Sequence, residues 1–408
     1  MENFLGLSFF LIIFLIILIS TKEKTQVRDF LIIAFLLRSA LVIFDHFNFI
    51  IIPESGDSDS YVFEINARKI SKNFGFLVIS DIFQFSSQFL SKLISIFYTI
   101  FGESKLMARS LSVALGTVSV YLVYYICLKL WDYRSAEKAA WITTFFPTLI
   151  LYSSLTLREP YIVFFLLTII VSMIKLFQKN SFISFLYLLF GSYILMLLHG
   201  PLIFGSLIFL FFFFLNSFRE QLVKIFELKI IKSFFIITIT LLIILIIFFD
   251  NNLKVPYLGN FQDLLNFDQL SQKINLYFKG SLTYPSWLII SDTKELFFKG
   301  IIKIFYFLFG PFVWSIQEPK HIFGLFDGML YILFIFYLIK NWYFIWRNPV
   351  TRMLLIILAS YIIIYGIGVG NFGTAIRHRS KFIVMLIILG APMINKFVFS
   401  FNKKIYKR

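Results

Sequence analysis

Long apolar runs alternate with short polar segments along almost the whole chain. Each run holds about 17 to 25 residues with few charges, which is the length an α-helix needs to cross a bilayer. We therefore predict an all-α polytopic membrane protein. About eleven transmembrane spans are expected, over residues 3–20, 29–50, 106–129, 138–157, 160–176, 181–198, 201–216, 232–249, 322–340, 352–370 and 380–396.

Two further apolar stretches, residues 82–101 and 297–316, are interrupted by polar or basic side chains. This pattern is typical of a helix that lies along the membrane interface. The two stretches fall within the two longest connections, 53–105 and 250–321, and long connections often carry function. Because no repeat or low-complexity linker divides the chain, we expect a single transmembrane domain, residues 1–408, with two external loops.

The composition agrees with a membrane protein. Hydrophobic residues make up 59% of the 408 residues and charged residues 15%, and the mean hydropathy is +0.85, far from ordinary soluble usage. The first apolar run lacks a basic start and a small-residue cleavage site, so we expect a retained helix. Cys127 is the only cysteine, which excludes an intrachain disulfide and a four-thiolate metal site.

The formal net charge is +16. Lysines and arginines gather in alternate short connections, around residues 22–28, 129–138, 175–179, 219–232, 340–352 and 396–408. Cytoplasmic loops of membrane proteins carry such an excess, so we predict an external amino terminus and two external long loops. Because the basic residues are spread over many loops, we expect contact with membrane lipids and no nucleic-acid partner.

The stretch PESGDSDSY, residues 53–61, places Asp57 and Asp59 directly after an apolar run. A helix is expected to begin near Asp57, and four polar residues then share one of its faces: Asp57, Tyr61, Glu64 and Arg68. A carboxylate beside a tyrosine and a cation is a candidate general base. The alternative is that Asp57 or Asp59 only caps the helix. A divalent cation could also bind the two aspartates, although two carboxylates are a weak metal signal.

Two more groups of polar residues end predicted spans on the external side. Arg158 and Glu159 precede Pro160, which suits the first turn of a helix. Arg158 is a candidate ligand for an anionic head group; the alternative is an Arg158–Glu159 pair that marks a hairpin turn. His199 is a candidate for proton transfer or for a hydrogen bond to a sugar, and the alternative is a helix cap.

The third group lies in GNFGTAIRHRSKF, residues 370–382, which carries Arg377, His378, Arg379 and Lys381 on the predicted external side. A basic cluster there runs against the usual charge bias, and binding of a phosphate or diphosphate would explain it. The alternative is interfacial anchoring of the last helix. The histidines show no zinc-binding spacing, and aromatic residues around 280–314 indicate membrane anchoring or stacking on sugars.

Several of these residues together resemble the GT-C superfamily, polytopic glycosyltransferases that use polyprenyl-phosphate-linked sugars. The likeness is carried by Gly56, Asp57, Tyr61 and the Ala67–Arg68 pair, by FGESKLMARSLSVALGTVSVYLVYYICLKLWDYRSAEKAAW, and by FFPTLILYSSLTLREPYIVFF. It covers residues 50–200 and is nearest to protein O-mannosyltransferases and lipid A aminoarabinose transferases. The resemblance implies a catalytic aspartate at Asp57. Ser58 stands where the family often has an acidic residue, which leaves the choice between Asp57 and Asp59 open.

The resemblance further implies inversion at the anomeric carbon, with polyprenyl phosphate as the leaving group and no nucleotide sugar. We therefore expect a glycosyltransferase of cell-envelope synthesis in a bacterial inner membrane, with its active site outside. The acceptor is a glycan, a lipid or a protein, and no cofactor beyond a divalent cation is expected. One alternative is a polysaccharide repeat-unit polymerase, which the basic cluster would suit. Another is a transporter of lipid-linked sugars, which would need charged residues along a path at mid-bilayer. The few candidates all lie near the ends of predicted spans: Arg38, Asp45 and Arg109.

Overall fold

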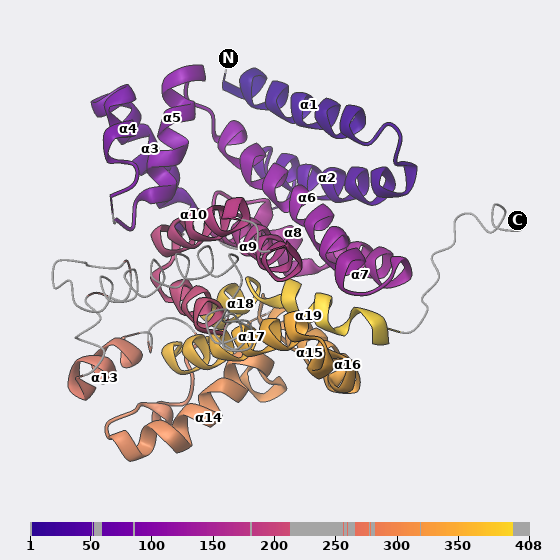
Figure 1. The fold of residues 1–408 in the computed structure, drawn as a ribbon. Coiled ribbons are helices and arrows are strands. Elements are labelled where there is room, and N and C mark those ends of the chain that lie inside the picture. The colour runs from indigo at the N-terminus through magenta and orange to yellow at the C-terminus, as the bar shows by residue number, and fades with distance from the viewer. Residues whose placement is uncertain are drawn as a thin grey trace, which may run out of the picture.

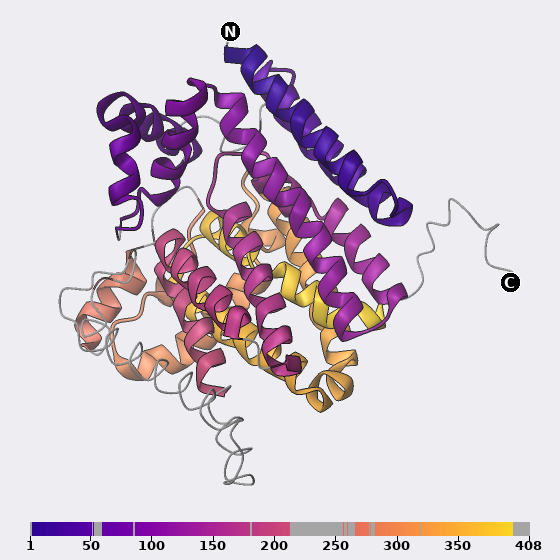
Figure 2. The same cartoon turned by 45° about the horizontal axis from the view of Figure 1, so that its top comes forward.

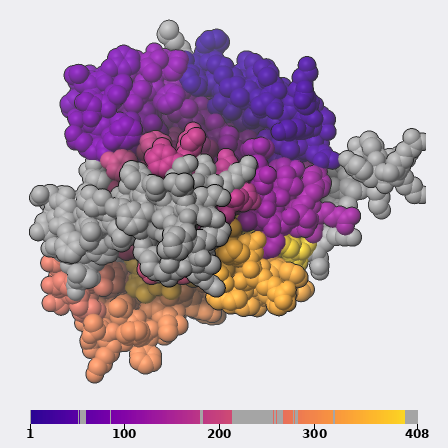
Figure 3. Space-filling model, in the orientation of Figure 1, coloured from indigo at the N-terminus to yellow at the C-terminus, as the bar shows by residue number. Residues whose placement is uncertain are grey.

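The computed structural model describes most of the chain, and its elements are helices joined by turns. The described residues are 2–50, 52, 59–84, 86–179, 182–212, 256, 259, 266–276, 278, 282–318 and 320–394. The predicted span 232–249 and Asp57 therefore lie outside them. Figure 3 shows described amino-terminal residues, in indigo and purple, along one side of the molecule and described residues beyond 282, in orange, along the opposite side.

The amino-terminal layer is built around α6, Lys105–Leu130, which packs against α1, α2 and α7. The helices α1, Glu2–Ser20, and α2, Thr25–His46, form a hairpin, and α7 covers Tyr133–Phe145. Figure 2 shows α1 running along the outside of the bundle beside α6. Close packing of α1 on α6 uses Gly6, where an added Cβ would come within 2.2 Å of Cβ of Leu106.

A smaller helical unit follows α2 and covers one end of this layer (Figure 1). Its main helices are α3, Asp59–Phe74, and α5, Phe89–Phe101, with the short α4, Val78–Asp81, between them. The hydroxyl of Ser91 donates to the carbonyl of Phe63 at 3.1 Å and joins the two main helices. The predicted interfacial stretch 82–101 is helical only from Phe89 onward.

In the middle of the chain, one predicted span differs from the structure. Residues 138–157 do not form one helix, because α7 ends at Phe145 and α8 covers Pro147–Ser153. Phe146 has extended backbone angles, since the ring of a proline disfavours helical geometry in the residue before it. The helices α9, Glu159–Lys179, and α10, Phe182–Leu198, then pack side by side. A short turn of helix, Gly200–Leu202, follows them.

The carboxyl-terminal layer begins with two helices of the second long loop, α13, Phe267–Asn275, and α14, Thr293–Phe309. Further helices are α15, Lys320–Lys340, α16, Trp342–Arg347, α17, Pro349–Gly368, α18, Phe372–Arg379, and α19, Ile383–Gly390. The predicted span 380–396 is shorter than expected, because α19 gives way to a turn of 3-10 helix at Ala391–Met393. Pro392 lies in that turn and has no backbone N–H to continue an α-helix.

Within the described residues, five helices are long and apolar enough to cross a membrane: Glu2–Ser20, Lys105–Leu130, Glu159–Gln178, His321–Lys340 and Pro349–Gly368. A largely helical chain with helices suited to a membrane is thus confirmed, while the count of eleven spans is not. Several other predicted spans are shorter apolar helices in the described residues.

The connections gather at two ends of the bundle. At one end, Tyr133 bonds to Gln26, and Nζ of Lys138 donates to the carbonyl of Ile394 at 2.7 Å. At the other end, Arg68 of α3 pairs with Glu2 at 3.3 Å. Connections that the charge pattern assigned to one side of the membrane therefore meet in space. The candidate site lies at the end that includes α3.

Candidate functional site

The short helix α18 carries the predicted basic cluster. Its N-cap is Asn371, whose side chain accepts a hydrogen bond from the backbone N–H of Thr374 at 2.7 Å. An antiparallel bridge joins Asn371 to Thr283. Because side-chain capping and backbone pairing act on the same residue, the start of α18 is fixed relative to the second long loop.

Arg377 joins three segments that are far apart in the sequence. Its Nη1 atom lies 2.6 Å from Oδ2 of Asp59 in α3, and its Nε atom lies 2.8 Å from Oε1 of Glu159 in α9. The side chain of Glu159 is 2% exposed, whereas that of Asp59 is 51% exposed. One guanidinium thus links a buried carboxylate to a carboxylate that solvent can reach.

Lys381 adds a second cation behind this bridge, in the turn between α18 and α19. Its Nζ atom lies 3.6 Å from Oε1 of Glu159 and 2.8 Å from Nδ1 of His378. Burial lowers the pKa of Lys381 to about 7, although the attraction of Glu159 opposes this shift. The charge of the cluster therefore depends on pH in the neutral range.

Two histidines pack beside Lys381. The ring centroids of His199 and His378 lie 5.1 Å apart, and Nδ1 of His199 shares a hydrogen bond with the hydroxyl of Tyr365 at 2.7 Å. Burial, together with the nearby charge of Lys381, lowers the pKa of both histidines well below the usual range. Both imidazoles are therefore neutral at pH 7 and can donate or accept hydrogen bonds.

Arg158 belongs to the same cluster. Its Nη1 atom donates to the carbonyl of Leu198 at 3.3 Å, and its guanidinium carbon lies 5.3 Å from the ring centroid of Phe63 in α3. The predicted hairpin after α8 thus places Arg158 and Glu159 together with α18. Residues predicted separately in four parts of the sequence form one group: Asp59, Arg158, Glu159, His199, Arg377, His378 and Lys381.

Arg379, a predicted phosphate ligand, lies apart from the other residues of the basic cluster. Its side chain is 1% exposed and pairs with Asp327 of α15 at 2.7 Å, and it donates to backbone carbonyls that include those of Phe307 and Gly310. In an α-helix, side chains two positions apart in the sequence lie about 200° apart around the helix axis. Arg379 therefore points to the opposite side of α18 from Arg377 and joins helices instead.

The predicted polar face of α3 also divides between different surroundings. Tyr61 is 47% exposed, and Arg68 pairs with Glu2 and, at 3.9 Å, with Glu103, so neither joins the cluster. Glu64 is buried and accepts a hydrogen bond from the hydroxyl of Thr156 at 2.5 Å. Arg68 lies more than two helical turns beyond Asp59. The two ends of this face therefore contact different parts of the molecule.

Tyr365 is the residue of the cluster that sequence reasoning missed. It is one of two tyrosines in the apolar helix α17, where a tyrosine gives no signal that separates it from core packing. Its hydroxyl bonds to His199, and its ring centroid lies 5.0 Å from that of His378.

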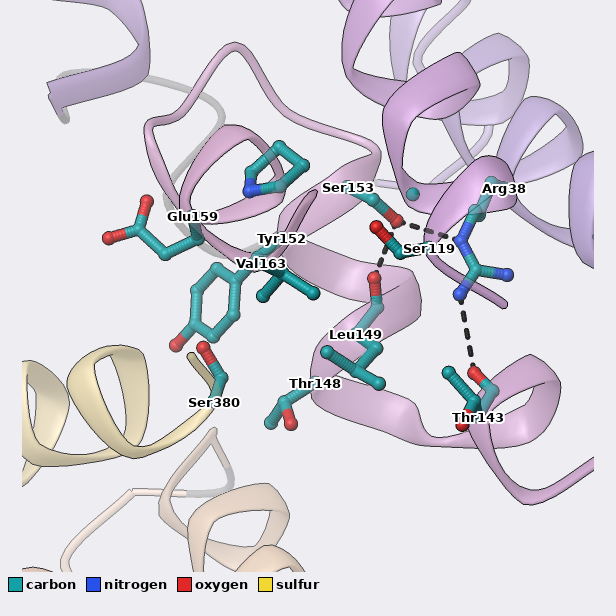
Figure 4. A pocket seen from close by; sticks show the side chains of 12 residues that line it. Arg38, Ser119, Thr143, Thr148, Leu149, Tyr152, Ser153, Glu159, Val163 and Ser380 are labelled. Atoms are coloured by element: carbon teal, nitrogen blue, oxygen red, sulfur yellow. Dashed lines mark hydrogen bonds between the residues drawn. The ribbon is translucent and has the colours of Figure 1, made fainter. Parts of the chain in front are cut away.

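A small cavity lies beside Glu159 (Figure 4). Glu159 stands at one end of it and Arg38 at the other, with Tyr152 and Ser153 of α8 between them. Its volume of about 20 Å³ has room for a single water molecule. Oε2 of Glu159 is buried and has no hydrogen-bond partner among the described residues, and Figure 4 shows this carboxylate directed away from the other labelled residues of the cavity.

Within the described residues, no group of three or more histidines, cysteines, aspartates or glutamates could hold a metal ion. The divalent cation at Asp57 and Asp59 stays a prediction, because Asp57 is not among those residues. No model of a known protein family matches the chain, and no curated protein sequence matches it either. The geometry of the cluster is therefore the basis for a functional proposal.

Proposed function

We propose that the protein is a membrane glycosyltransferase that moves a sugar from a polyprenyl-phosphate donor to an acceptor outside the cell, in cell-envelope synthesis. The observation that carries the proposal is the double bridge of Arg377 to Asp59 and Glu159. It sets the half-exposed carboxylate of Asp59 beside the mostly buried guanidinium of Arg377, at one end of an apolar helical bundle. Transfer from a phosphorylated lipid requires both a base and a cation at such a place.

The step uses these groups in distinct roles. Asp59, or Asp57 two residues earlier, removes the proton of an acceptor hydroxyl, and that oxygen attacks the anomeric carbon of the sugar. The bond from this carbon to the phosphate oxygen breaks, and the electron pair leaves with polyprenyl phosphate. Arg377, Arg158 and Lys381 stabilise the negative charge that develops on the leaving group. The proton remains on the aspartate until solvent removes it.

The other two interpretations have weaker support. A repeat-unit polymerase was suggested by the basic cluster, but Arg379 is committed to Asp327 and to backbone carbonyls. A transporter needs charged residues along a path, whereas Arg109 is fully buried and paired with Asp45 at 2.6 Å. The bacterial inner membrane, the external orientation and the nature of the acceptor remain part of the proposal.

The test compares surface glycans by mass spectrometry in cells that express equal amounts of wild type, Asp57→Asn or Asp59→Asn, and in cells without the protein. Loss of a general base lowers turnover by about 10²- to 10⁴-fold, so at least one variant should match the cells without the protein and accumulate lipid-linked donor. Asp81→Asn is the matched control, because Asp81 is an exposed carboxylate of the same helical unit. Wild-type glycans in both aspartate variants would overturn the proposal.

A further inference from the structure

A buried ion cluster lies behind the first turns of α3. Arg109 of α6 is fully buried, and its Nη1 atom lies 2.6 Å from Oδ2 of Asp45, near the end of α2. Its Nε atom lies 3.8 Å from Oε1 of Glu64 in α3. The cluster therefore ties α2, α3 and α6 together through one guanidinium.

The same cluster reaches the segment that carries Glu159. Oε1 of Glu64 accepts a hydrogen bond from the hydroxyl of Thr156, and the hydroxyl of Ser60 accepts one from the backbone N–H of Thr156 at 3.2 Å. Ser60 is the neighbour of Asp59, and Thr156 lies three residues before Glu159. Two bonds thus set the distance between the two segments that Arg377 bridges.

Asp45 fixes the chain on the other side of α3. Its Oδ1 atom accepts a hydrogen bond from the backbone N–H of Ile52 at 2.8 Å. One carboxylate of the cluster therefore holds the chain before α3, and the other holds α3 itself. Asp59 and Glu64 are five residues apart, which separates them by about 140° around the helix. Glu64 can thus anchor α3 from behind while Asp59 faces Arg377.

We propose that Arg109 is a positioning residue, which acts through Glu64 and Asp45 to hold Asp59 against Arg377 and Glu159. A buried carboxylate that loses its cation is strongly destabilised. Burial already raises the pKa of Glu64, and Arg109 opposes that rise. Without Arg109 the two carboxylates separate or take up protons, and α3 loses its fixed place. The effect of Arg109 on catalysis rests on the proposed function, whereas its effect on geometry does not.

The first experiment measures geometry without activity. Full-length protein with Cys127→Ala and Glu159→Gln carries Asp59→Cys and Arg377→Cys, and a short reagent with two thiol-reactive ends crosslinks them. Glu159→Gln removes the buried charge that Arg377 otherwise balances. Arg109→Met should lose most of the crosslinked product, and Arg109→Lys should restore part of it. Arg38→Met is the matched control, because Arg38 is buried and bonded to Ser153 and to backbone carbonyls of α2 and α7; it should crosslink as the parent does. Crosslinking of Arg109→Met at the parent rate would overturn the proposal.

Glu64→Gln provides the second variant if Arg109→Met does not fold. It keeps the shape of the side chain and removes the charge that faces Arg109, so crosslinking should fall to an intermediate level; parent-level crosslinking would count against the proposal. In a transferase assay with purified protein and lipid-linked donor, Arg109→Met should lower kcat about 100-fold, as expected for a misplacement of about 1 Å, with KM for the donor little changed. If wild type shows no transferase activity while crosslinking still depends on Arg109, the proposed function fails and the positioning role stands.

Discussion

Nη1 of Arg377 lies 2.6 Å from Oδ2 of Asp59, although 318 positions separate the two residues in the chain. The pair connects α3, in the amino-terminal part of the molecule, with α18, in the carboxyl-terminal part. Because the same guanidinium also holds Glu159, the three residues form one electrostatic unit. The first predictions concern the contribution of these three residues to the free energy of unfolding.

Arg377→Met should destabilise the protein much more than Asp59→Asn. The first change leaves Glu159 buried without its nearest cation, and breaking a buried pair costs about 3–5 kcal/mol. Lys381, at 3.6 Å, offsets part of that cost. Asp59 is half exposed, so its loss should cost less than about 1 kcal/mol. Thermal unfolding in detergent measures both changes.

The matched rescue is Arg377→Met combined with Glu159→Gln. Removing the charge from both partners avoids the buried, unpaired carboxylate, so the double variant should be more stable than Arg377→Met alone. Equal stability of the single and double variants would show that Glu159 does not depend on Arg377.

Binding of an anionic lipid should depend on pH through Lys381. Its pKa of about 7 means that the amine is charged below pH 7 and neutral above it. Affinity for polyprenyl phosphate, measured by calorimetry, should therefore fall about tenfold from pH 6 to pH 8, the value of one charge-assisted hydrogen bond. Lys381→Arg keeps its charge over this range and should remove the dependence; an unchanged profile in that variant would exclude Lys381 as the cause.

Lys381 also makes the free energy of unfolding depend on pH. The unfolded chain has the ordinary lysine pKa of 10.5, above the folded value of about 7. Between these values the unfolded state binds more protons, so the contribution of Lys381 to stability rises as pH rises through this window. Unfolding by heat at pH 7 and pH 9 tests this, and Lys381→Met should flatten the trend.

The ends of helices could be predicted from the sequence wherever an apolar run meets a polar turn. The expected span 106–129 corresponds to α6, Lys105–Leu130. The pattern failed at Phe146, because an apolar run shows no break where Pro147 bends the chain. The conformational preference of the residue before a proline could be predicted from the sequence. The packing of α7 and α8 on either side of it could not.

The site was predictable as a set of separate groups. Charges at the ends of apolar runs marked Arg158, Glu159 and Arg377, since such charges need partners or water. The sequence could not show that they meet, because that depends on how helices pack. The orientation of Arg379 away from Arg377 follows from helical geometry alone, so one basic run in the sequence serves two different surroundings.

Gly116→Ala should destabilise the protein. An added Cβ would lie 2.6 Å from Cβ of Ser153 and 3.1 Å from Nε of Arg38, so both must move. Overpacking of this kind costs about 1–3 kcal/mol. Gly368→Ala is the matched control, because no atom lies within 4 Å of its added Cβ, and its unfolding temperature should not fall. A tolerated Gly116→Ala would contradict the close packing of α6 on α8.

Arg379→Met should damage stability without a specific effect on donor binding. Arg379 and Asp327 are both 1% exposed, and loss of one buried partner costs about 3–5 kcal/mol. Asp327→Asn in the same chain should restore part of the stability, because it removes the unpaired charge. Arg347→Met is the control, since Arg347 is exposed and stacks on Tyr343 at 4.2 Å, and it should cost less than about 1 kcal/mol.

Donor affinity, measured on the folded fraction, should change with Arg377→Met and not with Arg379→Met, because only Arg377 faces Asp59. Equal losses of affinity in the two variants would return Arg379 to the binding site.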